Sequence, residues 1–299
     1  MIIISNVTKT YPNGVCANRD ISLTVGDGAV TGLVGPNGAG KTTLVQQILG
    51  VIRTDAGRIT VDGRERDTSD VAYVPQFPAL YPALSAVETV AAGLMYCGSA
   101  KRDAMRTAGE TLERVGLGAK ARQYAYTLSG GQKKLLSFAC ALAQGRKNLI
   151  LDEVTSMVDI VTKQTVWRII AEERDRGAAI LLASHDISEI KEPCTSFAAL
   201  KNGAVAFSGR PEDIPAELCH CKITVSDLER AVETLNSPDC RYELLGDRIT
   251  ILTDSLSRML PLIDRVDKAA SILSLNCEHP SLYEGILSLL KRDQEGSAS

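Results

Sequence analysis

No window of this 299-residue sequence has the roughly 18–20 apolar residues that a membrane-spanning helix requires. The first five residues have no basic segment ahead of an apolar core, so they do not look like a secretory signal peptide. If the protein works at a membrane, we therefore expect another chain to supply the membrane-spanning segments.

Lysine and arginine form no basic block, and a formal net charge of −3 gives a nucleic-acid partner no electrostatic support. The eight cysteines have no disulfide spacing, so we expect reduced cytosolic thiols. The run Cys219-His220-Cys221 offers metal-ligand side chains, but adjacent residues rarely share one zinc ion. No second pair lies nearby at zinc-finger spacing, so metal binding there is disfavoured.

The order of expected elements indicates an α/β protein of about two domains. Residues 1–212 alternate strands and helices around a helical insertion at about 77–145. Strands are expected at 2–5, 22–25, 29–34, 58–61, 71–74, 149–151 and 179–183, with helices at 41–49 and 161–176 and a hairpin around Asn202-Gly203.

Residues 213–299 restart the pattern as a small α+β domain in the order βαββαβα, whose first six elements match the ferredoxin-like arrangement. Ser226 with Glu229, and Ser281 with Glu284, have the spacing of capping boxes that open its first and last helices. We expect residues 293–299 to be a disordered tail.

Residues 35–42, Gly-Pro-Asn-Gly-Ala-Gly-Lys-Thr, match the phosphate-binding pattern G-x-x-x-x-G-K-[ST] between an expected strand and an expected helix. The glycines let the backbone wrap around phosphates, and Lys41 reaches the β- and γ-phosphates. The Thr42 hydroxyl is a ligand for Mg²⁺. The sequence therefore predicts a nucleotide-binding loop.

An apolar strand at 149–151 ends in two carboxylates, Asp152 and Glu153. Many strands end in acidic residues, but beside a phosphate-binding loop Asp152 can hold Mg²⁺ directly or through water. Glu153, one residue further on, points in a different direction and can polarise an attacking water.

Three further residues have weaker signals. His185 follows the strand at 179–183, where it can serve the γ-phosphate or the attacking water, although a lone histidine is more often structural. Gln76 stands at a strand end before the helical insertion, where a metal and a moving subdomain can meet. Tyr11 precedes a turn, and it either stacks on a base or is an ordinary strand aromatic.

Residues 128–132, Leu-Ser-Gly-Gly-Gln, have the features of a helix start. Ser129 and Gln132 have capping-box spacing, and a helix-prone run extends to Gln144. A helix that begins on two glycines presents bare backbone N–H groups and the positive end of its dipole. The sequence therefore predicts an anion site at this helix start.

These motifs together resemble the nucleotide-binding subunit of an ABC transporter, in that family's order and spacing over residues 1 to about 212. The resemblance implies a RecA-like P-loop core and a head-to-tail dimer, either of two identical chains or with another ATP-binding subunit. ATP then lies between Lys41 of one subunit and Ser129, Gly130 and Gly131 of the other, so the predicted anion is the γ-phosphate held by the partner.

The resemblance implies that Glu153, His185 and Gln76 are catalytic, and that Thr42, Gln76 and Asp152 hold Mg²⁺. It also implies an ATPase, cytoplasmic and peripheral on the inner face of the membrane, that moves a permease through the helical insertion. The ATP-binding residues implied are Tyr11, Gly35, Asn37, Gly38, Ala39, Gly40, Lys41, Thr42, Thr43, Ser129, Gly130, Gly131 and Gln132.

The stretch from Val74 to Ser85 resembles that of efflux subunits with a separate permease, and residues 280–284 resemble the C-terminal extension of the drug- and antibiotic-export branch. Export of an unidentified substrate is therefore the leading hypothesis. The alternatives are a soluble ABC-type ATPase, for which no second cassette or zinc module is present, and a low-activity regulatory subunit. A GTPase is disfavoured because the sequence has no Asn-Lys-x-Asp.

The sequence departs from the family pattern in three places. Residues 154–159 read Val-Thr-Ser-Met-Val-Asp where Pro-Thr-Ser-Gly-Leu-Asp is usual, Leu135 replaces a frequent arginine, and Arg146 replaces a frequent proline. The first two lie near the expected dimer interface, so they bear on dimer geometry and rate more than on ATP binding.

Overall fold

The computed structural model describes residues 1–65, 68–156, 158–186, 190, 192–210, 213, 219–236, 240–246, 248–253 and 256–278. The chain divides into two compact units, Met1–Pro211 and Glu212–Ser299, which are described separately. The sequence places the domain boundary one residue later, between 212 and 213.

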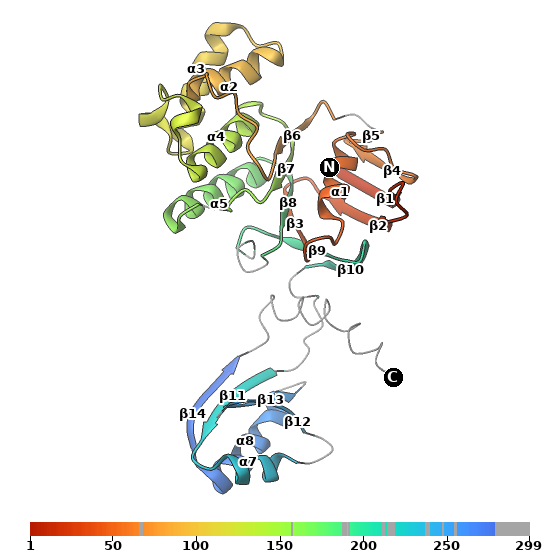
Figure 1. The fold of residues 1–299 in the computed structure, drawn as a ribbon, viewed down its shortest axis with the longest axis vertical. Coiled ribbons are helices and arrows are strands. Elements are labelled where there is room, and N and C mark those ends of the chain that lie inside the picture. The colour runs from red at the N-terminus through yellow and green to blue at the C-terminus, as the bar shows by residue number, and fades with distance from the viewer. Residues whose placement is uncertain are drawn as a thin grey trace. The chain divides into compact units, whose positions relative to one another are not determined.

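A six-stranded sheet forms the centre of the first unit, in the order β10-β9-β3-β8-β7-β6 (Figure 1). All neighbours in this sheet are parallel except β9 and β10, which form the hairpin expected around Asn202-Gly203. Every residue of β7 and β8 is buried, as expected for apolar strands covered on both faces. The strands are β3 (Ala29–Val34), β6 (Val71–Val74), β7 (Asn148–Asp152), β8 (Ala179–Ser184), β9 (Ser196–Lys201) and β10 (Ala204–Gly209).

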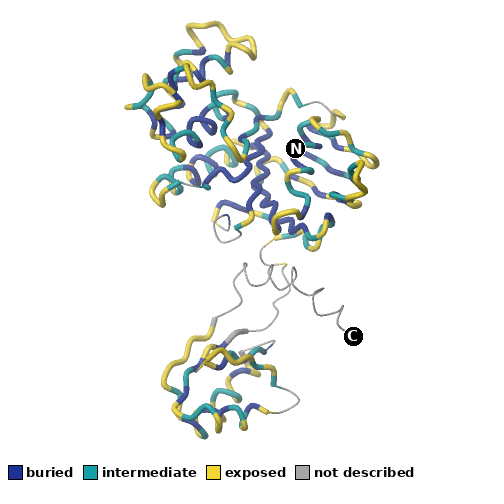
Figure 2. Tube along the Cα trace, viewed as in Figure 1, coloured by how far each residue is buried: buried dark blue, intermediate teal, exposed yellow. Residues whose placement is uncertain are grey.

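A second, antiparallel sheet has the order β2-β1-β4-β5. Its strands are β1 (Ile2–Thr10), β2 (Cys16–Val25), β4 (Ala56–Val61) and β5 (Arg64–Glu65). The helix α1 (Lys41–Ile48) follows the phosphate-binding loop. One buried cluster joins Ile4 and Val25 of this sheet, Leu44 of α1, and Leu33 and Leu181 of the six-stranded sheet. This core, dark blue in Figure 2, holds the start of α1 beside the strand ends.

The helical insertion contains α2 (Ala86–Tyr96), α3 (Lys101–Arg114) and α4 (Gly130–Ala143), and α5 (Ile160–Asp175) precedes β8. Figure 1 shows α4 and α5 on the opposite side of the six-stranded sheet from α1. Ser129 caps α4 and forms the predicted capping box with Gln132. On α5, the predicted apolar face of Val166, Ile169 and Ile170 is buried.

The second unit contains one antiparallel sheet in the order β12-β13-β11-β14, with α7 (Leu228–Leu235) and α8 (Leu256–Ala270). Its strands are β11 (Cys219–Val225), β12 (Arg241–Leu245), β13 (Arg248–Thr253) and β14 (Ile272–Glu278). Numbered within the unit, this order is 2-3-1-4, which is the ferredoxin-like arrangement that the sequence predicts. Buried residues of both helices and of β11 and β13 form its own core.

The predicted cap of α7 is wrong. Asp227, and not Ser226, is the N-cap, and its carboxylate accepts a hydrogen bond from the Arg230 N–H at 3.2 Å. The Ser226 hydroxyl instead donates to the Ala270 carbonyl at the end of α8, at 2.8 Å. The predicted cap at Ser281, the last helix and the tail at 293–299 lie outside the described residues.

Within the part of the chain that the structure describes, every helix is too short or too polar to cross a membrane.

Candidate nucleotide site

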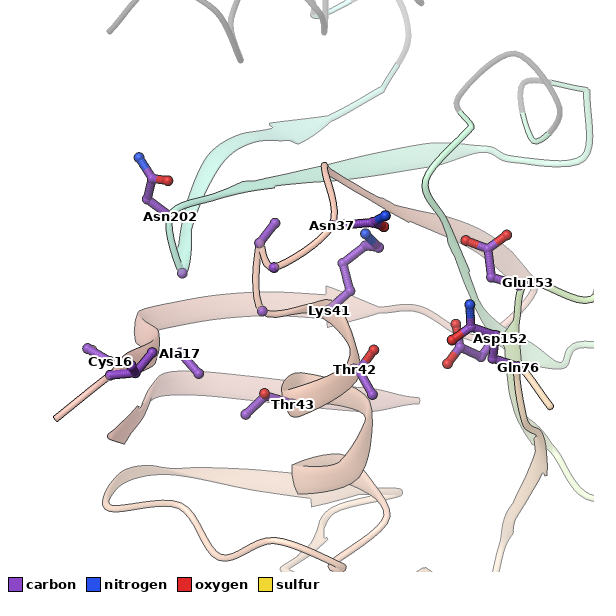
Figure 3. Close-up of a pocket in the computed structure, with 15 residues that line it drawn as sticks. Cys16, Ala17, Asn37, Lys41, Thr42, Thr43, Gln76, Asp152, Glu153 and Asn202 are labelled. Atoms are coloured by element: carbon purple, nitrogen blue, oxygen red, sulfur yellow. The ribbon is translucent and has the colours of Figure 1, made fainter. Parts of the chain in front are cut away.

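A cavity of about 370 Å³ opens where β3 and β7 end. Figure 3 shows Lys41 and Thr42 between the segment that carries Cys16 and Ala17 and the strand ends that carry Asp152 and Glu153. The cavity brings together these residues predicted to bind nucleotide, to hold metal or to be catalytic: Asn37, Gly38, Ala39, Gly40, Lys41, Thr42, Thr43, Gln76, Asp152 and Glu153.

The phosphate-binding loop is held in a shape that requires glycine. Gly40, the N-cap of α1, has φ of 102°, and a Cβ there would lie 2.3 Å from the Ala17 carbonyl oxygen. Lys41 lies over the loop, where its Nζ donates to the carbonyls of Gly35 at 2.6 Å and Pro36 at 3.1 Å. Burial lowers the pKa of Lys41, although Glu153 and Asp152 oppose this. The loop and its lysine therefore form a small cationic cradle at a helix N-terminus.

Asp152 is a buried acid whose neighbouring lysines do not offset the cost of ionising it. It is 6% exposed, and burial together with the charge of Glu153 raises its pKa from the ordinary 3.8 to about 6, against the opposing effects of Lys134 and Lys41. Two adjacent buried carboxylates, with the Thr42 hydroxyl and the Gln76 amide in the same cavity, form an oxygen-rich donor set. This set fits Mg²⁺, which prefers one or two carboxylates and keeps several waters.

Glu153 turns sharply away from its strand. Its φ of 53° lies in the left-handed region, which is uncommon for a residue with a side chain. The Glu153 N–H donates to the Ala183 carbonyl of β8 at 3.0 Å, and the Ser156 hydroxyl donates to the Glu153 carbonyl at 2.8 Å. These two bonds hold Glu153 in its strained conformation at the end of the strand.

Glu153 and His185 are in direct contact, which the sequence analysis does not predict. The carboxylate oxygen Oε1 of Glu153 accepts the His185 backbone N–H at 2.9 Å, and His185 Nδ1 lies 2.6 Å from the same oxygen. Asp152 pairs with Ala183 across adjacent parallel strands, so the residues that follow these strands meet at one edge. Glu153 is 7% exposed and the imidazole 58% exposed, so the histidine links the buried carboxylate to the surface.

The helix start at Ser129 lines a different cavity, of about 520 Å³, with Lys120, Leu135 and Asp159. Ser129 Oγ accepts the Gln132 N–H at 3.3 Å, and Gln132 Oε1 accepts the Ser129 N–H at 3.1 Å. The predicted contact residues Ser129, Gly130, Gly131 and Gln132 thus share one open surface of the chain, separate from the cavity around Lys41.

Besides the four residues at the helix start, the predicted nucleotide residues Tyr11 and Gly35 and the predicted catalytic residue His185 lie outside the lining of the first cavity. Gly35 begins the loop, and the Tyr11 hydroxyl lies 3.2 Å from Thr43 Oγ1. Conversely, Val15, Cys16, Ala17, Asn202 and Gly203 line the cavity but are not predicted. The hairpin turn reaches it because the Gly203 N–H donates to the Ala39 carbonyl at 3.2 Å. The Asn202-Gly203 pattern predicts the turn but does not predict that the turn contacts the phosphate-binding loop.

Comparison with known proteins agrees with this geometry. Residues 18–156 match the family model described as ABC transporter. The chain is 32% identical over 228 residues to a Nod factor export ATP-binding protein of Rhizobium etli, covering 74% of this chain and 72% of that protein. The chain belongs to the ABC transporter family. The matched part is its ATPase cassette, and the P-loop NTPase fold predicted from the sequence is confirmed.

Other relatives of the cassette differ in transport direction. The chain is 36% identical over 211 residues to a methionine import ATP-binding protein of Cereibacter sphaeroides, covering 67% of this chain but only 60% of that protein's length. A dimeric ATP-binding cassette solved in a post-hydrolysis state with ADP and Pi has a TM-score of 0.66 and 25% identity, covering 70% of this chain and 98% of that one. The matches thus include importers and exporters and do not single out the efflux branch.

Replacing Asp152 with Asn is expected to stabilise the metal-free, nucleotide-free cassette at neutral pH by about 2–3 kcal/mol. The pKa of Asp152 is raised, so its ionised form costs folding energy above a pH of about 6, and this cost disappears as the pH falls towards 3.8. The difference in unfolding free energy between variant and parent, measured in EDTA by denaturant titration, should therefore close on acidification. A difference that is constant with pH contradicts this assignment.

Proposed function

We propose that this chain powers transport through a separate membrane permease by ATP-driven closure and reopening of a dimer of the chain. The observation that carries the proposal is that one chain has two complementary half-sites. The cavity around Lys41, Asp152 and the Glu153–His185 pair is one half, and the capped helix start at Ser129 is the other. Because both halves are on the same chain, two copies arranged head to tail complete two sites, which favours the homodimer.

The γ-phosphate supplies the difference between the open and closed dimers. It reaches Lys41 in one copy and the N–H groups at Gly130 and Gly131 in the other, whereas ADP has no group at that position. A ligand shifts an equilibrium only by its different affinity for the two states, so ATP favours closure and ADP does not.

Within each site the residues have distinct roles. Thr42, Gln76 and Asp152 would hold Mg²⁺, which neutralises phosphate charge when bound. Glu153 takes the proton of the attacking water, since it is buried, acidic and one residue beyond Asp152. His185 orients Glu153 through the 2.6 Å contact and presents its exposed ring to the γ-phosphate.

An apolar groove on the helical insertion supports the coupling to a permease. It has a volume of about 560 Å³ and lies between the segment after β6, α2 and α4, with Pro75, Leu80, Ala92, Gly93 and Ala141 among its lining residues. Tyr81 and Tyr96 at the groove are 72% and 94% exposed. An apolar groove with aromatic side chains at its edge suits a short amphipathic helix from another protein. The groove adjoins the segment that carries Gln76, so a docked helix can follow motions of the nucleotide site.

A charge placed in this groove is expected to release the chain from membranes. Gly93 lies on α2 in the groove, and a Cβ there meets nothing within 4 Å, so Gly93→Glu leaves the fold intact. Binding would then bury an unpaired carboxylate, and we expect the membrane-bound fraction in the native cell to fall at least about fivefold. The measurement is the ratio of tagged chain in the membrane pellet to the soluble fraction.

Gly109→Glu is the matched control, because Gly109 is also a helical glycine with open space around its Cβ but lies outside the groove. Equal membrane fractions for the two variants would argue against permease docking in this groove, whereas the ATPase activity of the isolated chain should be unchanged in both.

Export is the direction we propose, on the resemblance of residues 74–85 to those of efflux subunits. Its test is ATP-dependent uptake into everted vesicles that contain the copurified permease, with substrates chosen by their stimulation of ATP hydrolysis. Uptake confined to right-side-out vesicles would assign import instead.

A further inference from the structure

Lys134 is a buried lysine on the second turn of α4 that has no role in the site described so far. It is 3% exposed, although lysine is almost never fully buried without a partner. Its Nζ donates to two consecutive backbone carbonyls, those of Pro75 at 3.1 Å and Gln76. These carbonyls begin the segment that follows β6, so the lysine joins α4 to the residue whose side chain lines the nucleotide cavity.

The charges around Lys134 belong to the nucleotide site. Burial lowers its pKa, while Asp152 and Glu153 act in the opposite direction, which places the ammonium group in the field of both carboxylates. In turn Lys134, more than Lys41, opposes the rise in the pKa of Asp152. The ammonium group therefore lies at the meeting point of α4, the Gln76 segment and the acidic end of β7.

We propose that Lys134 is a positioning residue for ATP hydrolysis, which ties the helix that begins at Ser129 to the backbone of Gln76. Through this tie, a displacement of α4 caused by the partner's γ-phosphate at Gly130 and Gly131 moves Gln76 in the cavity of the same chain. The helix start, which contacts the partner's nucleotide, and the cavity, which holds the chain's own nucleotide, are thereby coupled through the Lys134 side chain. The proposal rests on the composite dimer proposed above.

The first test compares Lys134→Met with Lys133→Met in the full-length chain. Both variants remove one lysine charge from the same helix, but the Lys133 side chain has no hydrogen bond or ion pair within the described residues, and Lys133 is only half-buried. We expect Lys134→Met to lower kcat at least about tenfold with KM for ATP changed less than about threefold, because a misplaced group affects the reaction more than ground-state binding. Lys133→Met should stay within twofold of the parent.

A second readout follows the Gln76 segment directly. Phe77 is 74% exposed next to Gln76, and Trp167 is the chain's one tryptophan, so Phe77→Trp reports on this segment after subtraction of the parent spectrum. In Lys134→Met the reporter should become more accessible to acrylamide and lose its response to ATP. Lys134→Arg keeps a charged donor. Its kcat should be at least threefold higher than that of Lys134→Met, and the reporter should respond to ATP again.

These experiments distinguish failure of the Lys134 positioning role from failure of the composite dimer site. If Lys134→Met keeps kcat within twofold of the parent, or lowers kcat while the Phe77→Trp reporter is unchanged, the positioning role is wrong. ATP-dependent dimerisation measured on the same samples reports on the dimer independently. If thermal unfolding shows that Lys134→Met is not folded, Lys134→Arg decides the question. A parent-like Phe77→Trp signal together with a parent-like kcat supports the tie. A Phe77→Trp signal that is fully accessible to acrylamide together with a parent-like kcat contradicts it.

Discussion

Glu153→Gln is expected to lower kcat for ATP hydrolysis by about 1000-fold while leaving ATP binding within a fewfold of the parent. Glutamine keeps the size of the side chain and can still contact the His185 backbone N–H, but it cannot accept the proton of the attacking water. Glu153 is buried and held in a left-handed backbone conformation, and the adjacent carboxylate, Asp152, is assigned to Mg²⁺, so we expect no other group to accept this proton. Single-turnover and steady-state rates with Mg·ATP measure the effect.

Two comparisons make this prediction specific. His185→Ala should lower kcat less, because it removes the orienting contact at Oε1 and leaves the carboxylate in place. Asp175→Asn, on the exposed end of α5, provides the matched loss of an acidic charge and should leave the rate unchanged. Equal rates for Glu153→Gln and the parent would remove Glu153 from its catalytic role.

Gly130→Asp is expected to lower ATPase activity by about 100-fold or more without weakening ATP binding to the single chain. A Cβ at Gly130 meets nothing within 4 Å, and an acidic residue in the first turn of α4 interacts favourably with the helix dipole, so the fold is preserved. In the closed dimer the same carboxylate would face the partner's γ-phosphate, where like charges repel.

Fluorescent-nucleotide titration measures binding to the Gly130→Asp chain, and phosphate release measures its activity. Gly109→Asp, on α3, is the control for replacing a helical glycine that has open space around its Cβ. Loss of binding in Gly130→Asp would mean that the helix start contributes to the site of its own chain. Full activity would mean that it contributes to neither.

Much of the cassette was predictable because its signals are local. The P-loop pattern sets β3, the turn and α1 within a short stretch, and the observed β3 begins and ends at the predicted residues. The Ser129–Gln132 capping box is likewise a property of four consecutive residues. In the second unit, alternation and turns predict the strand order because few ferredoxin-like connections are possible.

The parts that the sequence does not predict depend on contacts between distant residues. The Glu153–His185 contact requires β7 and β8 to be neighbours, and the Lys134 tie joins residues 58 and 59 positions apart. The cap of α7 shows the opposite case, in which two adjacent residues both have suitable side chains. Ser226 is drawn away by the Ala270 carbonyl, and Asp227 takes the cap.

The central claim is that the nucleotide is held between two copies of this chain, and sedimentation velocity of Glu153→Gln tests it most directly. We expect a dimer with Mg·ATP, a monomer with ADP, and a monomer again with Mg·ATP once Gly130→Asp is added to the same chain. A Glu153→Gln chain that binds ATP but remains monomeric at concentrations well above its nucleotide Kd would contradict the claim.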